Sequence, residues 1–165
     1  MVYQLGALRA VAAAQGASLT HVKPHGALYS ILSESEQHAR AVIEGIVDVD
    51  PSLIYLATDM RLYELAEEYP LAAVFEGYVD LDYRDDRSVI IPKRKAARDP
   101  DLVADRFVDI ATEGRVESVS GTTLEVPAES ICIHGDTPNV VEILEAIHRR
   151  IDATGIELVS LTAQT

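Results

Sequence analysis

The chain has 165 residues, of which 48% are apolar, and its 14 basic and 27 acidic residues give a formal net charge of −13. These totals predict one domain over residues 1–165, long enough to bury a core. A surface this acidic is a poor partner for nucleic acid or an anionic membrane, and no apolar run reaches the length of a membrane span. The N-terminus does not resemble a signal peptide, and the lone Cys132, which allows no internal disulfide, suits a reducing cytoplasm.

Helix-like and strand-like stretches alternate along the chain. Apolar periodicity and end signals predict helices over 2–15, 33–47, 59–70, 99–114 and 138–155. The second begins with a capping box at Ser33–Glu36, and the last has Asp136 or Thr137 as its N-cap. Apolar runs predict strands over 18–23, 53–57, 71–75, 131–133 and 156–161, and a small hairpin over 116–126. This alternation is typical of an α/β fold with mostly parallel strands.

Polar side chains follow four of the predicted strands. Right-handed crossovers place the ends of successive parallel strands on one rim. We therefore expect that rim to carry Lys23 and His25, Thr58 and Asp59, Glu76 and Asp80, and His134 and Asp136. The long polar segment 76–87 is typical of an active-site loop, and the basic cluster 93–98 is interpreted as a solvated loop or a phosphate contact. Polar clusters after four strands in turn favour an enzyme.

These residue types suit acid–base chemistry on an anionic substrate. The two rim imidazoles, near carboxylates, are able to share acid and base roles, and Lys23 is suited to hold a carboxylate or a phosphate. Gly135, before the last helix, is placed to present backbone N–H groups to an anion. A divalent metal held by Asp80, Asp136 and the imidazoles is the alternative. The chain has no nucleophile elbow, P-loop or GxGxxG motif.

Three segments, Val22–Tyr29, Glu76–Tyr83 and Ile131–Pro138, resemble the LamB/YcsF family, whose members are the A subunit of prokaryotic 5-oxoprolinase. The likeness begins at Tyr3 and runs over essentially the whole chain. It implies a partial (β/α) barrel of the glycoside hydrolase/deacetylase type. It also implies ATP-dependent opening of 5-oxoproline to L-glutamate, with Mg²⁺ accompanying the ATP, together with B and C subunits.

The resemblance also implies roles for particular side chains. Lys23 would steady an anion, and His25 and His134 would move protons. Glu76, Asp80 and Asp136 would orient those groups or hold Mg²⁺. The residues expected around the substrate are Gly26, Tyr29, Gly135 and Thr137.

The chain departs from the family pattern in two places. Leu81 stands where the family usually has a basic residue, although Lys93 keeps the basic residue that follows the later proline. The family's N-terminal acidic strand and two histidine-containing segments precede the point where this sequence starts. A barrel without its first strands exposes a sheet edge and apolar helix faces, so we expect a homo-oligomer.

Two alternative functions stay open. One is a metal-dependent amide or carbohydrate hydrolase on the same architecture, for which chelator-sensitive activity without ATP is the discriminating observation. The other is a non-catalytic remnant that binds the partner subunits without turnover.

Overall fold

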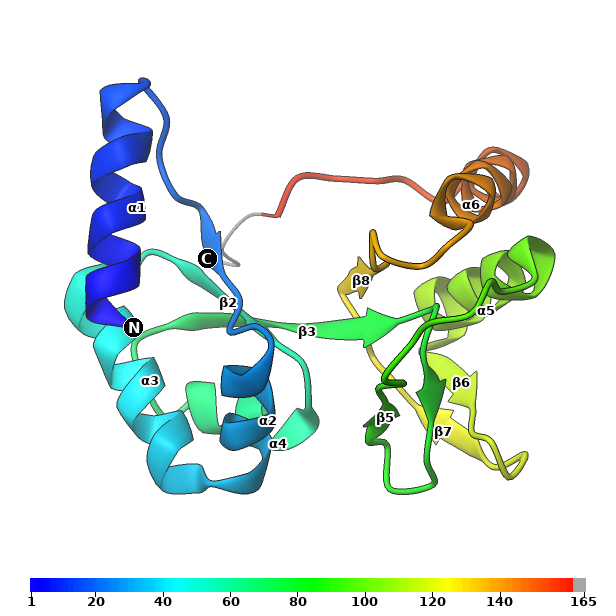
Figure 1. Ribbon diagram of the computed structural model, residues 1–165, viewed down its shortest axis with the longest axis horizontal. Coiled ribbons are helices and arrows are strands. Elements are labelled where there is room, and N and C mark those ends of the chain that lie inside the picture. The colour runs from blue at the N-terminus through cyan, green and yellow to red at the C-terminus, as the bar shows by residue number, and fades with distance from the viewer. Residues whose placement is uncertain (162–165) are drawn as a thin grey trace. The chain divides into compact units, whose positions relative to one another are not determined.

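The computed structural model describes residues 1–161. Residue contacts divide the chain into two compact units, one made of residues 1–75 with the segment that starts at Ser160, the other of residues 76–159. Figure 1 shows the helices and strands of both units. The two units are defined by contacts within the chain. The prediction of a single family domain over residues 1–165 therefore stays a prediction. Among the described residues, no helix is long and apolar enough to cross a membrane.

The first unit contains parallel strands and four helices. The strands are β1 (His21–Val22), β2 (Ile54–Ala57) and the first part of β3 (Ala72–Tyr78). The helices are α1 (Val2–Ala14), α2 (Ala27–Glu34), α3 (Glu36–Val49) and α4 (Met60–Ala66). Strand β2 is buried at all four positions, and apolar side chains from the helices pack against it, among them Leu32, Ile43, Ile46, Leu62 and Leu65. Their burial holds this unit together.

Local capping signals set two helix starts in this unit. Asp59 caps α4 as predicted, because its carboxylate accepts a hydrogen bond from the backbone N–H of Leu62 at 2.9 Å. The predicted start of α3 is displaced by two residues. Helix α2 continues through Glu34, so Ser35 rather than Ser33 is the N-cap, and its hydroxyl accepts from the backbone N–H of His38 at 3.5 Å.

The second unit combines a parallel strand pair, two helices and two hairpins. Residues 76–78 of β3 pair in parallel with β8 (Ser130–Cys132), and α5 (Pro100–Glu113) packs against α6 (Val140–Thr154) (Figure 1). The hairpin of β6 (Arg115–Glu117) and β7 (Thr123–Glu125) confirms the predicted one. A second hairpin, β4 (Asp82–Tyr83) with β5 (Val89–Ile90), begins within the polar segment 76–87 that was expected to be an active-site loop.

Gly77 lets β3 approach the chain beside it. A Cβ at this position would lie 3.0 Å from the Cβ of Ala128 and 3.3 Å from Cγ1 of Val126. Both distances are shorter than ordinary carbon contacts, so the close approach of these two segments depends on the missing side chain.

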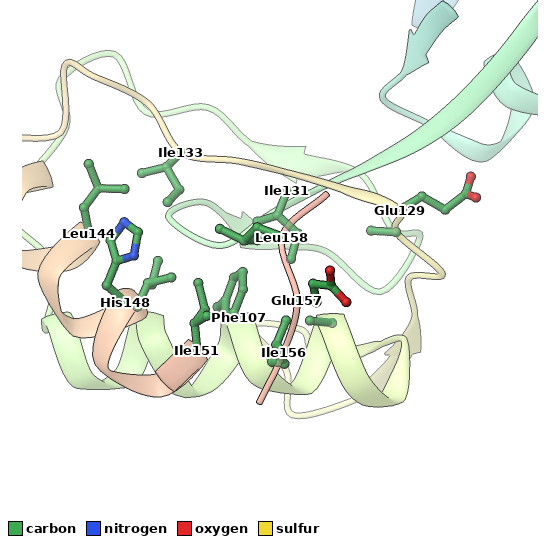
Figure 2. A pocket seen from close by; sticks show the side chains of 13 residues that line it. Phe107, Glu129, Ile131, Ile133, Leu144, His148, Ile151, Ile156, Glu157 and Leu158 are labelled. Atoms are coloured by element: carbon green, nitrogen blue, oxygen red, sulfur yellow. The ribbon is translucent and has the colours of Figure 1, made fainter. Parts of the chain in front are cut away.

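The last predicted strand is wrong, because residues 156–161 have no regular structure. Figure 2 shows what this segment does instead: Ile156 and Leu158 line a cavity of about 340 Å³ with Phe107, Ile131 and Ile133. A strand needs a neighbour to complete its backbone ladder. Here the apolar run is partly covered by side chains of α5, α6 and β8 without pairing.

Three further predictions need correction. Glu76 lies within β3 rather than after it, because the strand extends to Tyr78. Helix α6 begins at Val140 with Asn139 at its N-cap, since the hydroxyl of Thr137 is bonded elsewhere. The strand predicted over 131–133 was expected from its apolar run to be buried; β8 instead covers Ser130–Cys132 and is half-buried. The predicted α/β class, with mostly parallel strands and a small β-hairpin, is confirmed.

Candidate active site

Asp80 is the centre of a polar cluster in the second unit. Its carboxylate has no exposed surface and accepts hydrogen bonds from the backbone N–H of His134 at 3.1 Å and the hydroxyl of Thr137 at 2.8 Å. The Nδ1 of His134 lies 2.9 Å from its Oδ1. The strand register explains why Asp80 and His134 lie together. Tyr78 of β3 pairs with Cys132 of β8, and Asp80 and His134 each follow two positions later on their own segment.

Hydrogen bonding keeps Asp80 ionised. Burial alone would raise the pKa of this carboxyl group, but hydrogen bonds from His134 and Thr137 outweigh burial and hold the pKa below its usual value. An ionised carboxylate only accepts hydrogen bonds, so the Nδ1 atom of His134 must carry a proton. The neutral imidazole then has its lone pair on Nε2, the atom left for proton transfer.

Tyr78 fixes the plane of the imidazole. The two rings are stacked, with centroids 5.6 Å apart and planes 14° from parallel. The backbone N–H of Tyr78 in turn donates to the hydroxyl of Tyr83 at 2.7 Å. The imidazole of His134 is therefore held by a carboxylate at one edge and by an aromatic face, which leaves little rotational freedom.

Lys95 also belongs to this cluster, although the sequence placed it only in a basic segment interpreted as a solvated loop or a phosphate contact. Its ammonium bonds to Oδ1 of Asp136 at 2.5 Å and lies 4.0 Å from Oδ2 of Asp80. The side chain of Lys95 is only 11% exposed, whereas that of Asp136 is 76% exposed. The ion pair lowers the pKa of Asp136. A lysine in a basic run resembles a solvated loop, and only its burial distinguishes it.

Two contacts hold the segment that carries Lys95. Arg98 donates from both terminal nitrogens to Asp82, at 3.0 and 2.8 Å, and lowers the pKa of that carboxyl group. The backbone N–H of Arg98 donates to the side-chain oxygen of Asn139, whose amide donates back to the Arg98 carbonyl at 2.8 Å. The segment is thus fixed to β4 and to the start of α6.

The other predicted residues belong to the first unit. Tyr29 of α2 lies near Lys23, which follows β1, and near Thr58 and Asp59, which follow β2. Burial raises the pKa of Tyr29, and the hydrogen bond with Thr58 opposes that shift. His25 and Gly26 are exposed at the start of α2, where Gly26 has a φ of 63°.

The predicted rim residues therefore fall into two groups, one in each unit. Asp80, His134, Asp136 and Thr137 are brought together in the second unit. Glu76, of the same unit, is buried in β3 opposite Ser130 of β8.

The described residues form no Mg²⁺ site made of protein ligands alone. Within residues 1–161, no group of three or more His, Cys, Asp or Glu side chains is placed to hold a metal ion. Both oxygens of Asp80 already accept hydrogen bonds, and Asp136 is paired with Lys95. Magnesium that accompanies a nucleotide is bound through phosphate and water oxygens with only one or two carboxylates, so it would enter with the ATP phosphates rather than occupy a site built by these side chains.

Comparisons with known proteins agree with the architecture and the motifs. The sequence profile of the LamB/YcsF family matches residues 1–165. The chain is 40% identical over 164 residues to the A subunit of 5-oxoprolinase from Thermococcus onnurineus, covering 98% of this chain and 64% of that protein. It is 37% identical over 166 residues to an A subunit of 5-oxoprolinase from Agrobacterium fabrum, covering 99% of this chain and 65% of that protein.

A solved structure has the same fold. The crystal structure of the lactam utilization protein from Thermus thermophilus matches with a TM-score of 0.84 and 31% sequence identity, covering 99% of this chain and 65% of that one. The chain therefore spans slightly less than two thirds of the length of these relatives. The predicted fold class and the resemblance are confirmed: the chain belongs to the LamB/YcsF family.

Proposed function

We propose that this chain is the A component of a 5-oxoprolinase and takes part in the ATP-dependent opening of 5-oxoproline to L-glutamate. The observation that carries the proposal is the Asp80–His134 pair, with Nδ1 of the imidazole 2.9 Å from a buried, ionised carboxylate. Relatives of the same family that are named as A subunits of 5-oxoprolinase support the choice of substrate.

The reaction needs one group that both takes and returns a proton. Transfer of the terminal phosphoryl group of ATP to the lactam oxygen activates the carbonyl carbon; one water then opens the ring and a second water releases phosphate. Nε2 of His134 takes the proton of the attacking water, and Asp80 stabilises the imidazolium that forms. When the C–N bond breaks, the imidazolium returns the proton to the departing nitrogen, which becomes the amino group of glutamate.

The residues of the first unit have proposed roles as well. Lys23 would neutralise an anionic oxygen, and His25 would supply a second proton-transfer group. Tyr29 and Gly26 would line the substrate. In the second unit, Gly135 would do so as well. Glu76 would orient neighbouring polar groups.

The test is glutamate formation from 5-oxoproline and ATP with the B and C subunits present. We expect His134→Gln to lower kcat by about a hundredfold or more, the usual contribution of a general acid–base group. His25→Gln tests the first unit in the same way. The matched control is His148→Gln, an exposed histidine of α6 outside the cluster. Wild-type turnover that His134→Gln leaves intact would refute the assignment, and a chain that binds the partners without turnover would be the non-catalytic remnant.

The proposal includes assembly with other chains. The B and C subunits are the expected partners, and we also expect association between copies of this chain. Four large apolar side chains of α1 are exposed, Val2, Tyr3, Leu8 and Val11, which supports association through that helix. Sedimentation velocity of the chain alone and with each partner measures both; a monomer at all concentrations would contradict self-association.

A further inference from the structure

A second feature adjoins the Asp80–His134 pair. A cavity of about 200 Å³ is lined by Pro92 and residues 94–98 together with Asp80 and Thr137. We propose that this cavity binds the carboxylate of 5-oxoproline, with Lys95 as the residue that pairs with it. The inference rests on the proposed function, because it names the substrate group that this site holds.

The charge of the cavity wall favours an anion. Its charged lining comprises three cations, Arg94, Lys95 and Arg98, against the single carboxylate of Asp80. Two carboxylates outside the wall offset part of this charge, since Asp82 pairs with Arg98 and Asp136 pairs with Lys95. An anion that displaces Asp136 would meet the ammonium of Lys95 in a chain whose net charge of −13 otherwise repels it.

The three cations are not equivalent. Arg98 is held by both oxygens of Asp82, so its guanidinium is already neutralised. Arg94 is exposed at the rim and, within residues 1–161, makes no hydrogen bond or ion pair. Lys95 alone is nearly buried, and its ammonium is the cation that faces the Asp80 cluster.

Asp136, which now pairs with Lys95, is suited to be displaced by a ligand. Asp136 is 76% exposed and would regain full hydration on leaving, whereas the side chain of Lys95 is 11% exposed and its ammonium needs an anion. Asp80 does not serve as that anion, since its nearer oxygen is 4.0 Å away and accepts from Thr137 and His134. A substrate carboxylate would take the position of the Asp136 carboxylate.

Size and position favour a small acid over a nucleotide. Pockets for drug-sized ligands have volumes of roughly 300–1,000 Å³, and this cavity is smaller. A five-membered lactam acid matches it better than the whole of ATP. Asp80 lines the cavity and also bonds to Nδ1 of His134, so a carboxylate on Lys95 would belong to the same polar cluster as the imidazole.

Binding to the isolated chain tests this assignment without turnover. Calorimetric titration would use 5-oxoproline, 2-pyrrolidone (the same lactam without the carboxylate) and ATP. We expect Lys95→Met to weaken 5-oxoproline binding by roughly ten- to a hundredfold, as for loss of a charge-assisted hydrogen bond, and to leave 2-pyrrolidone binding unchanged. Lys93→Met is the matched control, because Lys93 is exposed in the same segment and does not line the cavity.

The outcomes separate this inference from the proposed function. Equal 5-oxoproline affinity in Lys95→Met and wild type would overturn the cavity assignment even if turnover with the partner subunits is normal. A loss of ATP affinity instead of 5-oxoproline affinity would overturn it in favour of a phosphate. A selective loss of 5-oxoproline affinity would support it even if no turnover is found. Should Lys95→Met not fold, Lys95→Gln takes its place, and it must likewise lose about tenfold or more in 5-oxoproline affinity while 2-pyrrolidone binding stays unchanged.

Discussion

Replacing Asp80 by Asn tests the central hydrogen bonds of the cluster. The amide has nearly the same shape, but it has one acceptor oxygen where the carboxylate has two. Donors face both oxygens: Nδ1 of His134 at Oδ1, and the His134 backbone N–H and the Thr137 hydroxyl at Oδ2. The amide oxygen will keep the two donors at Oδ2, and its NH₂ group will face the imidazole. Nδ1 must then accept, so the proton moves to Nε2.

The expected cost follows from the strength of these bonds. A hydrogen bond to a charged group contributes about 1.5–3 kcal/mol and a neutral one about 0.5–1.5 kcal/mol, so each of three bonds loses about 1 kcal/mol. The amide is easier to bury than the carboxylate, which offsets part of that loss. We expect Asp80→Asn to lower the free energy of unfolding by about 2 kcal/mol at neutral pH. The displaced proton should lower kcat by a factor of about 10³ or more, since Nε2 is no longer a base.

Urea unfolding of wild type and Asp80→Asn over a pH series measures the difference in their free energies of unfolding. The folded pKa of Asp80 is lowered, so its contribution is complete above the unfolded value of about 3.9 and is lost as the pH falls through the folded value. The stability gap between wild type and Asp80→Asn should therefore be constant near neutrality and shrink in acid. Imidazole ¹⁵N shifts report the His134 tautomer. A gap below about 0.5 kcal/mol, or one unchanged in acid, would refute the reasoning.

Substitutions at three other positions test the packing and capping of the second unit by urea unfolding. Gly77→Ala should cost about 1–3 kcal/mol, because its Cβ would lie 3.0 Å from that of Ala128; wild-type stability would contradict the close approach. Asp99→Ala should cost about 1 kcal/mol through loss of the α5 N-cap, and Asp99→Asn should recover most of it. Tyr83→Phe should cost about 1–3 kcal/mol, because it leaves the buried N–H of Tyr78 without its acceptor; no change would mean that another acceptor replaces the hydroxyl.

Much of the fold was predictable because the signals are local. Asp59 and Asp99 bond to backbone N–H groups within three residues, and Gly114 and Gly155 end their helices in the left-handed region, at φ of 62° and 72°. Such contacts depend on a few neighbouring residues, so they can be read from the sequence. The parallel strands also follow from the alternation of helices with short apolar runs.

The errors occur where a distant partner decides the outcome. Thr137 has the composition of an N-cap, yet its hydroxyl bonds to Asp80, which lies 57 positions earlier in the chain. The run 156–161 has the composition of a strand but no pairing partner among the described residues. Local sequence does not carry either fact, because each depends on which segment lies alongside.

The candidate site shows the same division between local and distant information. Asp80 and His134 were predictable together, because each stands two residues beyond a paired position of neighbouring parallel strands, and strand ends gather polar function. Lys95 was not, because charge in a polar segment is ordinarily solvated and nothing in its neighbours marks it as buried. Its position depends on Arg98, which ties the segment to Asp82 and to the start of α6. A cation held in place by a second ion pair, beside an imidazole whose proton is fixed, is an arrangement suited to hold a charged substrate while its amide bond is opened.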